Sequence, residues 1–420
     1  MSNKSNKHLV LTTACLVICL FAASNSVCAQ VPCGGYEVTA IIQSDECPPF
    51  GFPGMVPDGM NDLGWVVGHF NACVIGPDVS WLWTPESGLE LLEMPPGSSQ
   101  SRAIDINNHP DRQIVGTVDI SDIGGTRAFL IDGEDLILIH PPNDGTFSSV
   151  AALNDQRQIV GLTADGTPFG KAYIWEDGAM TIIEPTFGPK SAAWDINEAG
   201  VVVGWMGNSQ LTDARAFIWE AGRMTLLPPI PGGSTSDGSA INDLRQVVGY
   251  GVVKNDVVIL VRAFLWENNQ YTDLGTLPGL DSCAAIDINN SSTVIGECGQ
   301  SDIPNSNQPY VWNKGVMINL NDLIPEGAGI TIREASAINN SGQIVARALN
   351  ADNDTVAVIL TPIKGPLADL NGDCAVSVAD LLILFASWGP CDDCGDCAAD
   401  LNGDCTVSTL DLLILFSNWV

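Results

Sequence analysis

One pattern of apolar and polar residues recurs seven times along the chain. Each copy has an apolar residue, an Asn, a short polar turn and then a β-branched run that ends in Gly or, in the last copy, Ala. The copies are MNDLGWVVG (60–68), INNHPDRQIVG (106–116), LNDQRQIVG (153–161), INEAGVVVG (196–204), INDLRQVVG (241–249), INNSSTVIG (288–296) and INNSGQIVA (338–346). Their asparagines are Asn61, Asn107, Asn154, Asn197, Asn242, Asn289 and Asn339, with successive gaps of 46, 47, 43, 45, 47 and 50 residues. So regular a period indicates a repeat architecture.

An aromatic segment follows the glycine in six of these copies. The segments are SWLW (80–83), AFLI (128–131), AYIW (172–175), AFIW (216–219), AFLW (263–266) and PYVW (309–312). A turn and another short apolar segment come next, such as MTLLP (224–228). Each period therefore predicts four short strands, which is typical of a β-propeller blade. We expect a mainly β body, a seven-bladed β-propeller over residues 30–362, with a β-solenoid as the alternative that has the same period.

The two ends of the body predict how the ring closes. The seventh copy stops at AVILTP (357–362), which matches a third strand and has no fourth strand after it. YEVTAII (36–42) reads as a fourth strand without a blade. Pairing the two would complete the seventh blade and remove its open edge.

The recurring residues have structural explanations. The turn Asn is expected to cap backbone groups and to tolerate left-handed geometry, and the glycine is expected to end a strand where chains crowd. The Trp residues are expected to fill space between blades. Cys283 and Cys298 stand nearly symmetrically about the turn at 289–292, which predicts a cross-strand disulfide.

After Pro366 the composition changes and a duplication begins. DLNGDCAVSVADLLILFASW (369–388) realigns onto DLNGDCTVSTLDLLILFSNW (400–419), and residues 369–420 contain nine Asp but no Lys, Arg or Glu. Each copy has the spacing of a twelve-residue calcium loop followed by an apolar helix, 381–388 or 412–419. Val376 and Val407, at position 8 of each loop, are expected to pair the two loops through a short β contact and to point into a small core.

Oxygen atoms at alternating loop positions predict two calcium sites. Positions 1, 3, 5, 9 and 12 supply side chains and position 7 a backbone carbonyl. The expected ligands are Asp369, Asn371, Asp373, Ala375, Ser377 and Asp380 in the first loop, and Asp400, Asn402, Asp404, Thr406, Ser408 and Asp411 in the second. Because the carboxylates of one loop repel one another without a cation, calcium is expected to be needed for the tail to fold.

The N-terminal residues 1–29 have the pattern of a secretory signal. Lys4, Lys7 and His8 precede an apolar run from Leu9 to Ala23, and small residues follow at the expected cleavage site. An uncleaved anchor is the alternative. Export to an oxidising compartment favours disulfides among the cysteines that remain, over a metal cluster at Cys391, Cys394 and Cys397.

Charge and motifs exclude several functions. Asp and Glu number 49 against 17 Lys and Arg, for a net charge of -32, and no basic patch for nucleic acid or anionic lipid is visible. The histidines, His8, His69, His109 and His140, show no metal-ligand spacing. No nucleophile elbow, HExxH helix or phosphate-binding loop occurs, and so no catalytic residue and no organic cofactor is predicted.

Two stretches resemble known families. RAFLWENNQYTDLGTLPG and AIDINNSSTVIG, within 262–296, resemble the extracellular HAF repeat, with Arg127, Lys171, Arg215 and Arg262 where the family has His. This resemblance implies a propeller-like extracellular fold.

The tail resembles the type I dockerin, an all-α pair of EF-hand loops that plugs into cohesin modules. It departs from that family at Cys374 and Cys405, where Gly is usual, and at recognition positions 378–379 and 409–410.

Together these features predict a chain with four parts: a signal peptide (1–29), the propeller (30–362), a linker (363–368) and a dockerin-like domain (369–420). The expected function is that of a secreted protein whose propeller binds a glycan or a protein and whose tail attaches it, through calcium, to a cohesin-like or other surface protein. A polysaccharide-degrading enzyme that carries a dockerin and a structural surface protein are the alternatives.

Overall fold

Every Asn-containing turn joins the first two strands of a four-stranded antiparallel sheet. The computed structural model describes residues 35–43, 54–71, 78–120, 125–141, 145, 147–164, 170–209, 213–254, 259–363, 365–371, 375–391 and 397–419. Tyr36–Pro362 forms one compact unit, and Ile363–Val420 belongs to another. The predicted signal at 1–29 and Cys394 lie outside the described residues.

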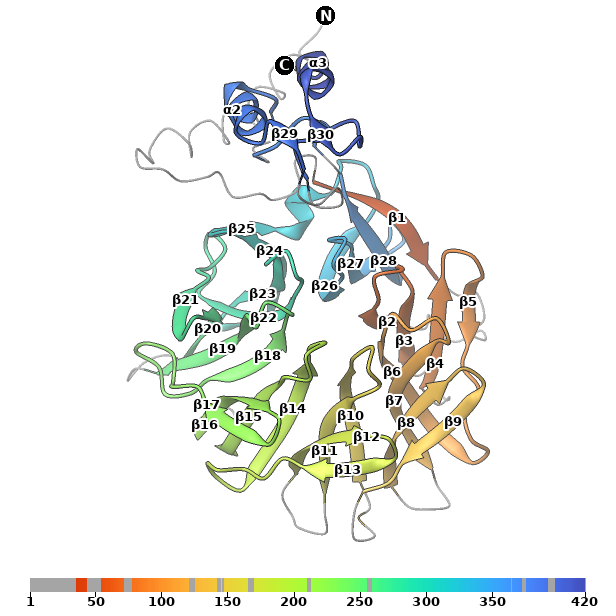
Figure 1. Cartoon of the computed structure of the whole chain (residues 1–420). Helices are drawn as coiled ribbons and strands as arrows, with labels where there is room; N and C mark the ends of the chain where they lie inside the picture. The colour runs from red at the N-terminus through yellow and green to blue at the C-terminus, as the bar shows by residue number, and fades with distance from the viewer. Residues whose placement is uncertain are drawn as a thin grey trace, which may run out of the picture. The chain divides into compact units, whose positions relative to one another are not determined.

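Seven such sheets follow one another around a ring, with their first strands nearest the centre (Figure 1). Blade 1 contains β2 (Gly54–Met60), β3 (Val66–Asn71), β4 (Val79–Thr84) and β5 (Gly88–Leu91). Blade 2 contains β6 (Ser98–Ile106), β7 (Gln113–Ile120), β8 (Gly125–Asp132) and β9 (Asp135–Ile139). Blade 3 contains β10 (Phe147–Leu153), β11 (Ile159–Ala164), β12 (Lys171–Glu176) and β13 (Ala179–Ile182).

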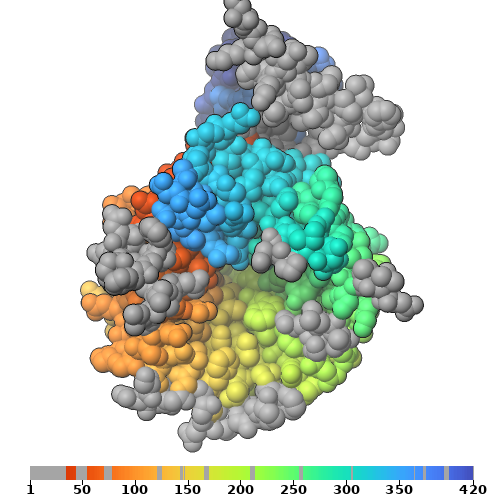
Figure 2. All heavy atoms as spheres, turned by 180° about the vertical axis from the view of Figure 1, so that it is seen from behind, coloured from red at the N-terminus to blue at the C-terminus, as the bar shows by residue number. Residues whose placement is uncertain are grey.

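The remaining blades repeat the strand order, and the colours of the opposite face follow the chain around the same ring (Figure 2). Blade 4 contains β14 (Lys190–Ile196), β15 (Val202–Ser209), β16 (Asp213–Glu220) and β17 (Arg223–Leu226). Blade 5 contains β18 (Asp237–Ile241), β19 (Val247–Lys254), β20 (Ile259–Glu267) and β21 (Gln270–Asp273). Blade 6 contains β22 (Ser282–Ile288), β23 (Val294–Gln300), β24 (Ile303–Asn313) and β25 (Val316–Asn319), and the short 3-10 helix η2 (Leu320–Leu323) follows.

Blade 7 is completed from both ends of the body, as the sequence predicts. It contains β26 (Thr331–Ile338), β27 (Ile344–Leu349), β28 (Thr355–Pro362) and, as its outer strand, β1 (Tyr36–Ile42). Tyr36 pairs with Pro362 and Ile42 with Ala357. Tyr36 and Ile42 are almost fully buried, in two different inter-blade clusters. The seven-bladed propeller is therefore confirmed, and the solenoid alternative is wrong.

In six repeats the second-strand glycine pairs with an aromatic residue of the third strand. It lies within the second strand rather than at its end, so that part of the prediction is wrong. Gly68 pairs with Trp81, and a Cβ at Gly68 would lie 2.1 Å from the Val56 carbonyl and 2.5 Å from the Trp81 ring. Gly116 has the same relation to Phe129. In blade 7 both members of the pair differ, since Ala346 stands in place of the glycine and pairs with Val358 in place of an aromatic residue.

The turn Asn itself is not left-handed, contrary to expectation. In six of the seven turns the left-handed residue stands three positions later, as at Gly64 (φ 76°), Gly200 (φ 72°) and Arg245 (φ 64°). The longer turn of blade 2 places it at Arg112 instead. The turn therefore requires left-handed backbone at one residue, and the Asn contributes side-chain hydrogen bonds.

The tail has its own core and two short helices. α2 (Val378–Ala386) and α3 (Thr409–Ser417) begin and end a few residues before the predicted ranges. Leu384 and Leu415 are fully buried in a core that includes Val376 and Val407. The β contact differs from the prediction, since β30 (Thr406–Val407) pairs with β29 (Gly389–Pro390) and not with the first loop. Each described helix follows a loop, and an EF-hand pair remains a prediction.

Disulfides are found in both units. Cys283 and Cys298 are bonded across β22 and β23, where they pair directly, as predicted. Cys391 and Cys397 are bonded to each other, so these two are not ligands of a metal cluster. Cys405 is also disulfide-bonded. Among the described residues, no helix is both long enough and apolar enough to cross a membrane.

Candidate functional site

The second loop of the tail brings its oxygen atoms together around backbone N–H groups. Asp400 accepts hydrogen bonds from the N–H groups of Gly403, Asp404 and Cys405, at 3.0, 3.2 and 2.7 Å. Asp411 accepts them from Asn402 at 3.1 Å and from Ser408 at 2.8 Å. The carboxylates at positions 1 and 12 therefore fold the loop back on itself.

The described part of the first loop repeats this arrangement at its far end. Asp380 accepts hydrogen bonds from the N–H groups of Leu370, Asn371 and Ser377, at 2.8, 3.0 and 2.7 Å. Asp369 and Ala375 lie in the described loop, and Asp373 lies outside the described residues.

Ser377 and Ser408 have a role that the ligand pattern did not include. Each is the N-cap of the following helix and forms a capping box with Asp380 or Asp411. Burial alone would raise the pKa of these two fully buried carboxyls, but the hydrogen bonds from backbone N–H groups outweigh it and lower both pKa values. Both groups are therefore carboxylates at neutral pH.

The loop chemistry fits a hard cation. Asp400, Asn402, Asp404, Thr406 and Asp411 offer oxygen donors, the type that calcium prefers. In the loop as it stands, the side chains of Asn402 and Asp404 bond each other at 3.0 Å. Within the described ranges, no three His, Cys, Asp or Glu side chains lie as the ligands of one metal would. A cation would therefore require these oxygen atoms to turn inward.

In the propeller, the seven turn asparagines form a closed ring. The side-chain Nδ2 of each one donates to the backbone carbonyl of the next, at 2.9–3.1 Å, and Asn339 returns to Asn61. All seven side chains are buried. The Asn Oδ1 atoms cap the turn, as predicted, while the donation across blades was not foreseen.

The residues that follow these asparagines form a second closed ring. A side-chain oxygen of each residue accepts a hydrogen bond from the backbone N–H of its counterpart in the preceding blade, at 2.7–3.1 Å. They are Asp62, Asn108, Asp155, Glu198, Asp243, Asn290 and Asn340. Every one carries a side-chain carbonyl oxygen, which is the signal in the aligned repeats that could have revealed the ring.

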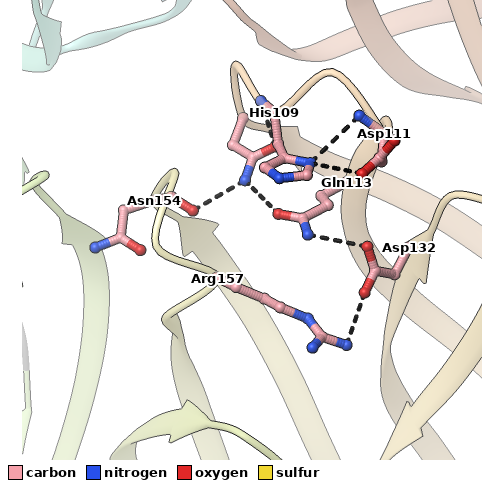
Figure 3. Close-up of polar contacts among 7 residues, drawn as sticks. His109, Asp111, Gln113, Asp132, Asn154 and Arg157 are labelled. Atoms are coloured by element: carbon pink, nitrogen blue, oxygen red, sulfur yellow. Dashed lines mark hydrogen bonds and ion pairs between the residues drawn. The ribbon is translucent and has the colours of Figure 1, made fainter.

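Charged groups strengthen individual junctions. Figure 3 shows the contact between blades 2 and 3, where Asn107 donates to Gln113 at 2.7 Å and to Asn154 at 3.0 Å. Gln113 in turn donates to Asp132 at 2.9 Å, and Arg157 of the next blade forms an ion pair with the same carboxylate at 2.8 Å. These contacts bind one blade to the next. They form no catalytic arrangement.

Three further carboxyls, Asp105, Asp195 and Asp287, stand two positions before the Asn in blades 2, 4 and 6. Each accepts the backbone N–H of the following blade, as Asp195 does from Ile241 at 2.7 Å. Gly or Ala occupies the same position in the other blades. Burial raises the pKa of Asp105 to about 7 and of Asp195 to about 8, and it also raises that of Asp287.

A pocket of about 290 Å³ opens at this end of the ring. It is lined by both rings and by Asp195 and Asp287, with six carboxyls in all and no Lys, Arg or His. Burial and the neighbouring carboxylates of Asp155, Asp243 and Asp62 raise the pKa of Glu198, although a backbone hydrogen bond opposes them. The pocket is unsuited to an anion, and most of its polar atoms already serve the rings.

Comparisons with known proteins support the fold and give no activity. The family described as "Protein of unknown function (DUF3466)" matches residues 184–387. No curated protein matches. The β-propeller domain of the Trilobed protease from Pyrococcus furiosus, described as having an open velcro topology, is 13% identical with a TM-score of 0.51. The match covers 74% of this chain and 95% of that one.

A solved oligogalacturonate lyase in complex with manganese is also similar, at 12% identity with a TM-score of 0.43, over 76% of this chain and 98% of that one. Likenesses at this level concern the fold alone. The present ring differs from an open topology, because β1 pairs with β28.

Proposed function

We propose that this chain is a secreted binding protein whose propeller recognises a ligand and whose tail attaches it to a partner in a calcium-dependent way. The observation that carries the tail's role is the second loop, where Asp400 and Asp411 each gather several backbone N–H groups within one twelve-residue segment. Residues 369–420 contain no Lys or Arg, so a cation is the natural counter-charge for these carboxylates.

Attachment is supported by apolar side chains that the two helices leave exposed. Leu382 and Phe385 of α2, Leu413 and Phe416 of α3, and the two tryptophans that follow these helices, Trp388 and Trp419, are 38–65% exposed and recur at three-residue spacing. A small module rarely displays such stripes unless they contact another surface. A cohesin-like module is the partner that the dockerin resemblance implies.

Calcium titration of the full-length chain by isothermal calorimetry tests the proposal. Two ions per chain are expected, held by the two loops, and Asp411→Asn should remove one of them. Asp352→Asn, on an exposed turn of the propeller, is the matched control and should leave both. No binding of calcium, or two ions retained by the Asp411→Asn chain, would refute the tail's role.

A polysaccharide-degrading enzyme is the second candidate. The observation that favours it is the raised pKa of Asp105 and Asp195, about 7 and 8, because a general acid must stay protonated near neutrality. Both carboxyls, however, already accept backbone hydrogen bonds from the next blade. Release of reducing sugar from polysaccharides, abolished by Asp195→Asn in a folded chain, would establish this candidate over the first.

A further inference from the structure

Beyond the Asn turn, in the middle part of its second strand, each blade carries a residue that differs in every repeat. It follows the second-strand glycine (Ala346 in blade 7), and the seven residues are His69, Thr117, Leu162, Trp205, Tyr250, Glu297 and Arg347. His69 pairs with Val56, whereas Val66 pairs with Met60 beside the turn. At about 3.4 Å per residue, this set lies roughly 13 Å from the Asn turns. We call the set and its first-strand neighbours the variable end.

Blades 7, 1 and 2 give the variable end a charged half. His69 Nδ1 lies 2.6 Å from the Asp58 carboxylate, and Arg347 forms an ion pair with Glu334 at 2.6 Å. Arg102 of blade 2 reaches back to Asp78 at 2.7 Å. Burial raises the pKa of the Asp58 carboxyl. The neighbouring His69 and Arg102 lower this pKa, and the Glu334 carboxylate raises it further. These groups therefore act on one another across the blade boundaries.

Blades 3, 4 and 5 give it an aromatic half. Trp205 packs with Trp194 and Leu162 in one apolar cluster. The indole Nε1 of Trp194 donates to Asp237 of the next blade at 3.1 Å, and the Tyr250 hydroxyl donates to the same carboxylate at 3.2 Å. Trp194 and Tyr250 are partly exposed, so that each combines an apolar surface with a fixed polar group.

Different side chains occupy this position from blade to blade. Thr117 and Leu162 occupy the same position in blades 2 and 3, so small or purely apolar residues suffice there. Trp205 Nε1 and Arg347 Nε are buried donors without an acceptor, one in each half.

We propose that the variable end binds a neutral oligosaccharide. A pyranose ring has an apolar face that can pack on Trp194 and Tyr250, and hydroxyls that can bond carboxylates and the Asp58–His69 pair. Carboxylates outnumber the two arginines, and each arginine is already ion-paired, which disfavours an anionic sugar. The inference rests on the propeller being the ligand-binding part of the proposed function.

Half-buried polar and aromatic groups also distinguish this end from a protein-docking patch. The large exposed apolar residues of the propeller, such as Leu63, Leu244 and Ile303, are scattered over different blades and none belongs to the set. Single exposed apolar residues of this kind are ordinary on a protein surface.

The test is calorimetric titration of the full-length chain with cellohexaose, xylohexaose and mannohexaose. At least one should bind, and Trp194→Phe and Tyr250→Phe should each weaken it about fivefold to tenfold, because each loses a hydrogen bond to Asp237. The matched controls are Trp219→Phe, in the same blade, and Tyr271→Phe, in the outer strand β21. Both should bind like the unaltered chain, and near-ultraviolet circular dichroism confirms that all four variants fold.

Each outcome has a distinct meaning. No binding of any hexasaccharide overturns the proposal and leaves the calcium titration of the tail unaffected. Binding that is weakened equally in the variants and their controls, or in none of them, places the saccharide elsewhere and also overturns it, although the propeller then remains a binding part. Loss confined to Trp194→Phe and Tyr250→Phe supports it.

Discussion

At the scale of single residues, two kinds of polar side chain hold neighbouring blades together at the Asn turns. Each turn Asn donates to the next blade while its Oδ1 caps its own turn, as Asn197 does for the N–H groups of Ala199 and Val201 at 3.1 and 3.0 Å. Asp105, Asp195 and Asp287 reach across the same boundaries. The Asn network is neutral, whereas these buried carboxyls can ionise, so the two kinds respond differently to substitution and to pH.

Asn197→Asp should destabilise the propeller by about 2–4 kcal/mol. The change keeps the capping oxygen and replaces the donor that faces the Asn242 carbonyl at 3.0 Å with an acceptor. The same exchange at Asn269, in an exposed hairpin turn, should change the free energy of unfolding by less than about 0.5 kcal/mol. Urea denaturation measures both free energies of unfolding. Equal midpoints for the two variants would contradict a contribution of the Asn ring to stability.

The propeller should lose stability as the pH rises from about 4 to about 8. An unfolded Asp ionises near its ordinary pKa of 3.8, while Asp195 in the folded protein stays protonated up to about 8. In that interval the unfolded state releases the proton and the folded state keeps it, so rising pH favours unfolding. Melting temperatures measured from pH 5 to pH 9 should fall.

Asp195→Asn separates this effect from the rest of the acidic surface. Its melting temperature should depend less on pH than that of the unaltered chain, even where its absolute stability is lower. Asp352→Asn, on an exposed turn, should retain the original pH dependence. If the melting temperatures of Asp195→Asn and Asp352→Asn depend equally on pH, burial of Asp195 does not cause the loss of stability at higher pH.

At the scale of elements, β1 decides whether the ring is closed. It pairs with β28 alone and forms the outer edge of blade 7. The side chains of adjacent residues alternate between faces of the strand, so Ile42 is 2% exposed and Ile41 is 49% exposed. The closure therefore depends on apolar burial as well as on backbone pairing.

Ile42→Ala and Ile41→Ala form a matched pair that tests this closure. The first should lower the free energy of unfolding by about 2–5 kcal/mol through lost burial and the resulting cavity, and the second by less than about 0.5 kcal/mol. Chemical denaturation, with limited proteolysis of the N-terminal strand, measures the difference. Similar small losses in both variants would mean that β1 contributes little to closure.

The elements could be predicted from the sequence because each repeats. Seven aligned copies made the strand order, the Asn turn and the shared blade visible, and the 15-residue separation of Cys283 and Cys298 matched their pairing. The Asn-to-carbonyl ring could not be predicted, since its acceptors lie in the next blade, 43–50 residues away in six cases and 278 in the closing one, and a backbone carbonyl has no sequence signal. Pairing of Thr406–Val407 with Gly389–Pro390 was missed for the same reason.

At the scale of the whole molecule, the two units differ in the interactions that hold them together. The propeller is closed by buried apolar clusters and by hydrogen bonds that need no ion. The tail concentrates carboxylates in two short loops around a small core. We propose the variable end of the propeller and the exposed apolar side chains of the tail as the surfaces that contact partners.

Differential scanning calorimetry of the full-length chain, with calcium and with a chelator, tests this division most directly. We expect one transition that calcium leaves in place, from the propeller, and another, from the tail, that calcium raises by on the order of 10–30 °C. Asp411→Asn should reduce only the second shift. A scan in which calcium moves neither transition, or moves both equally, would contradict a calcium-dependent tail joined to an ion-independent propeller.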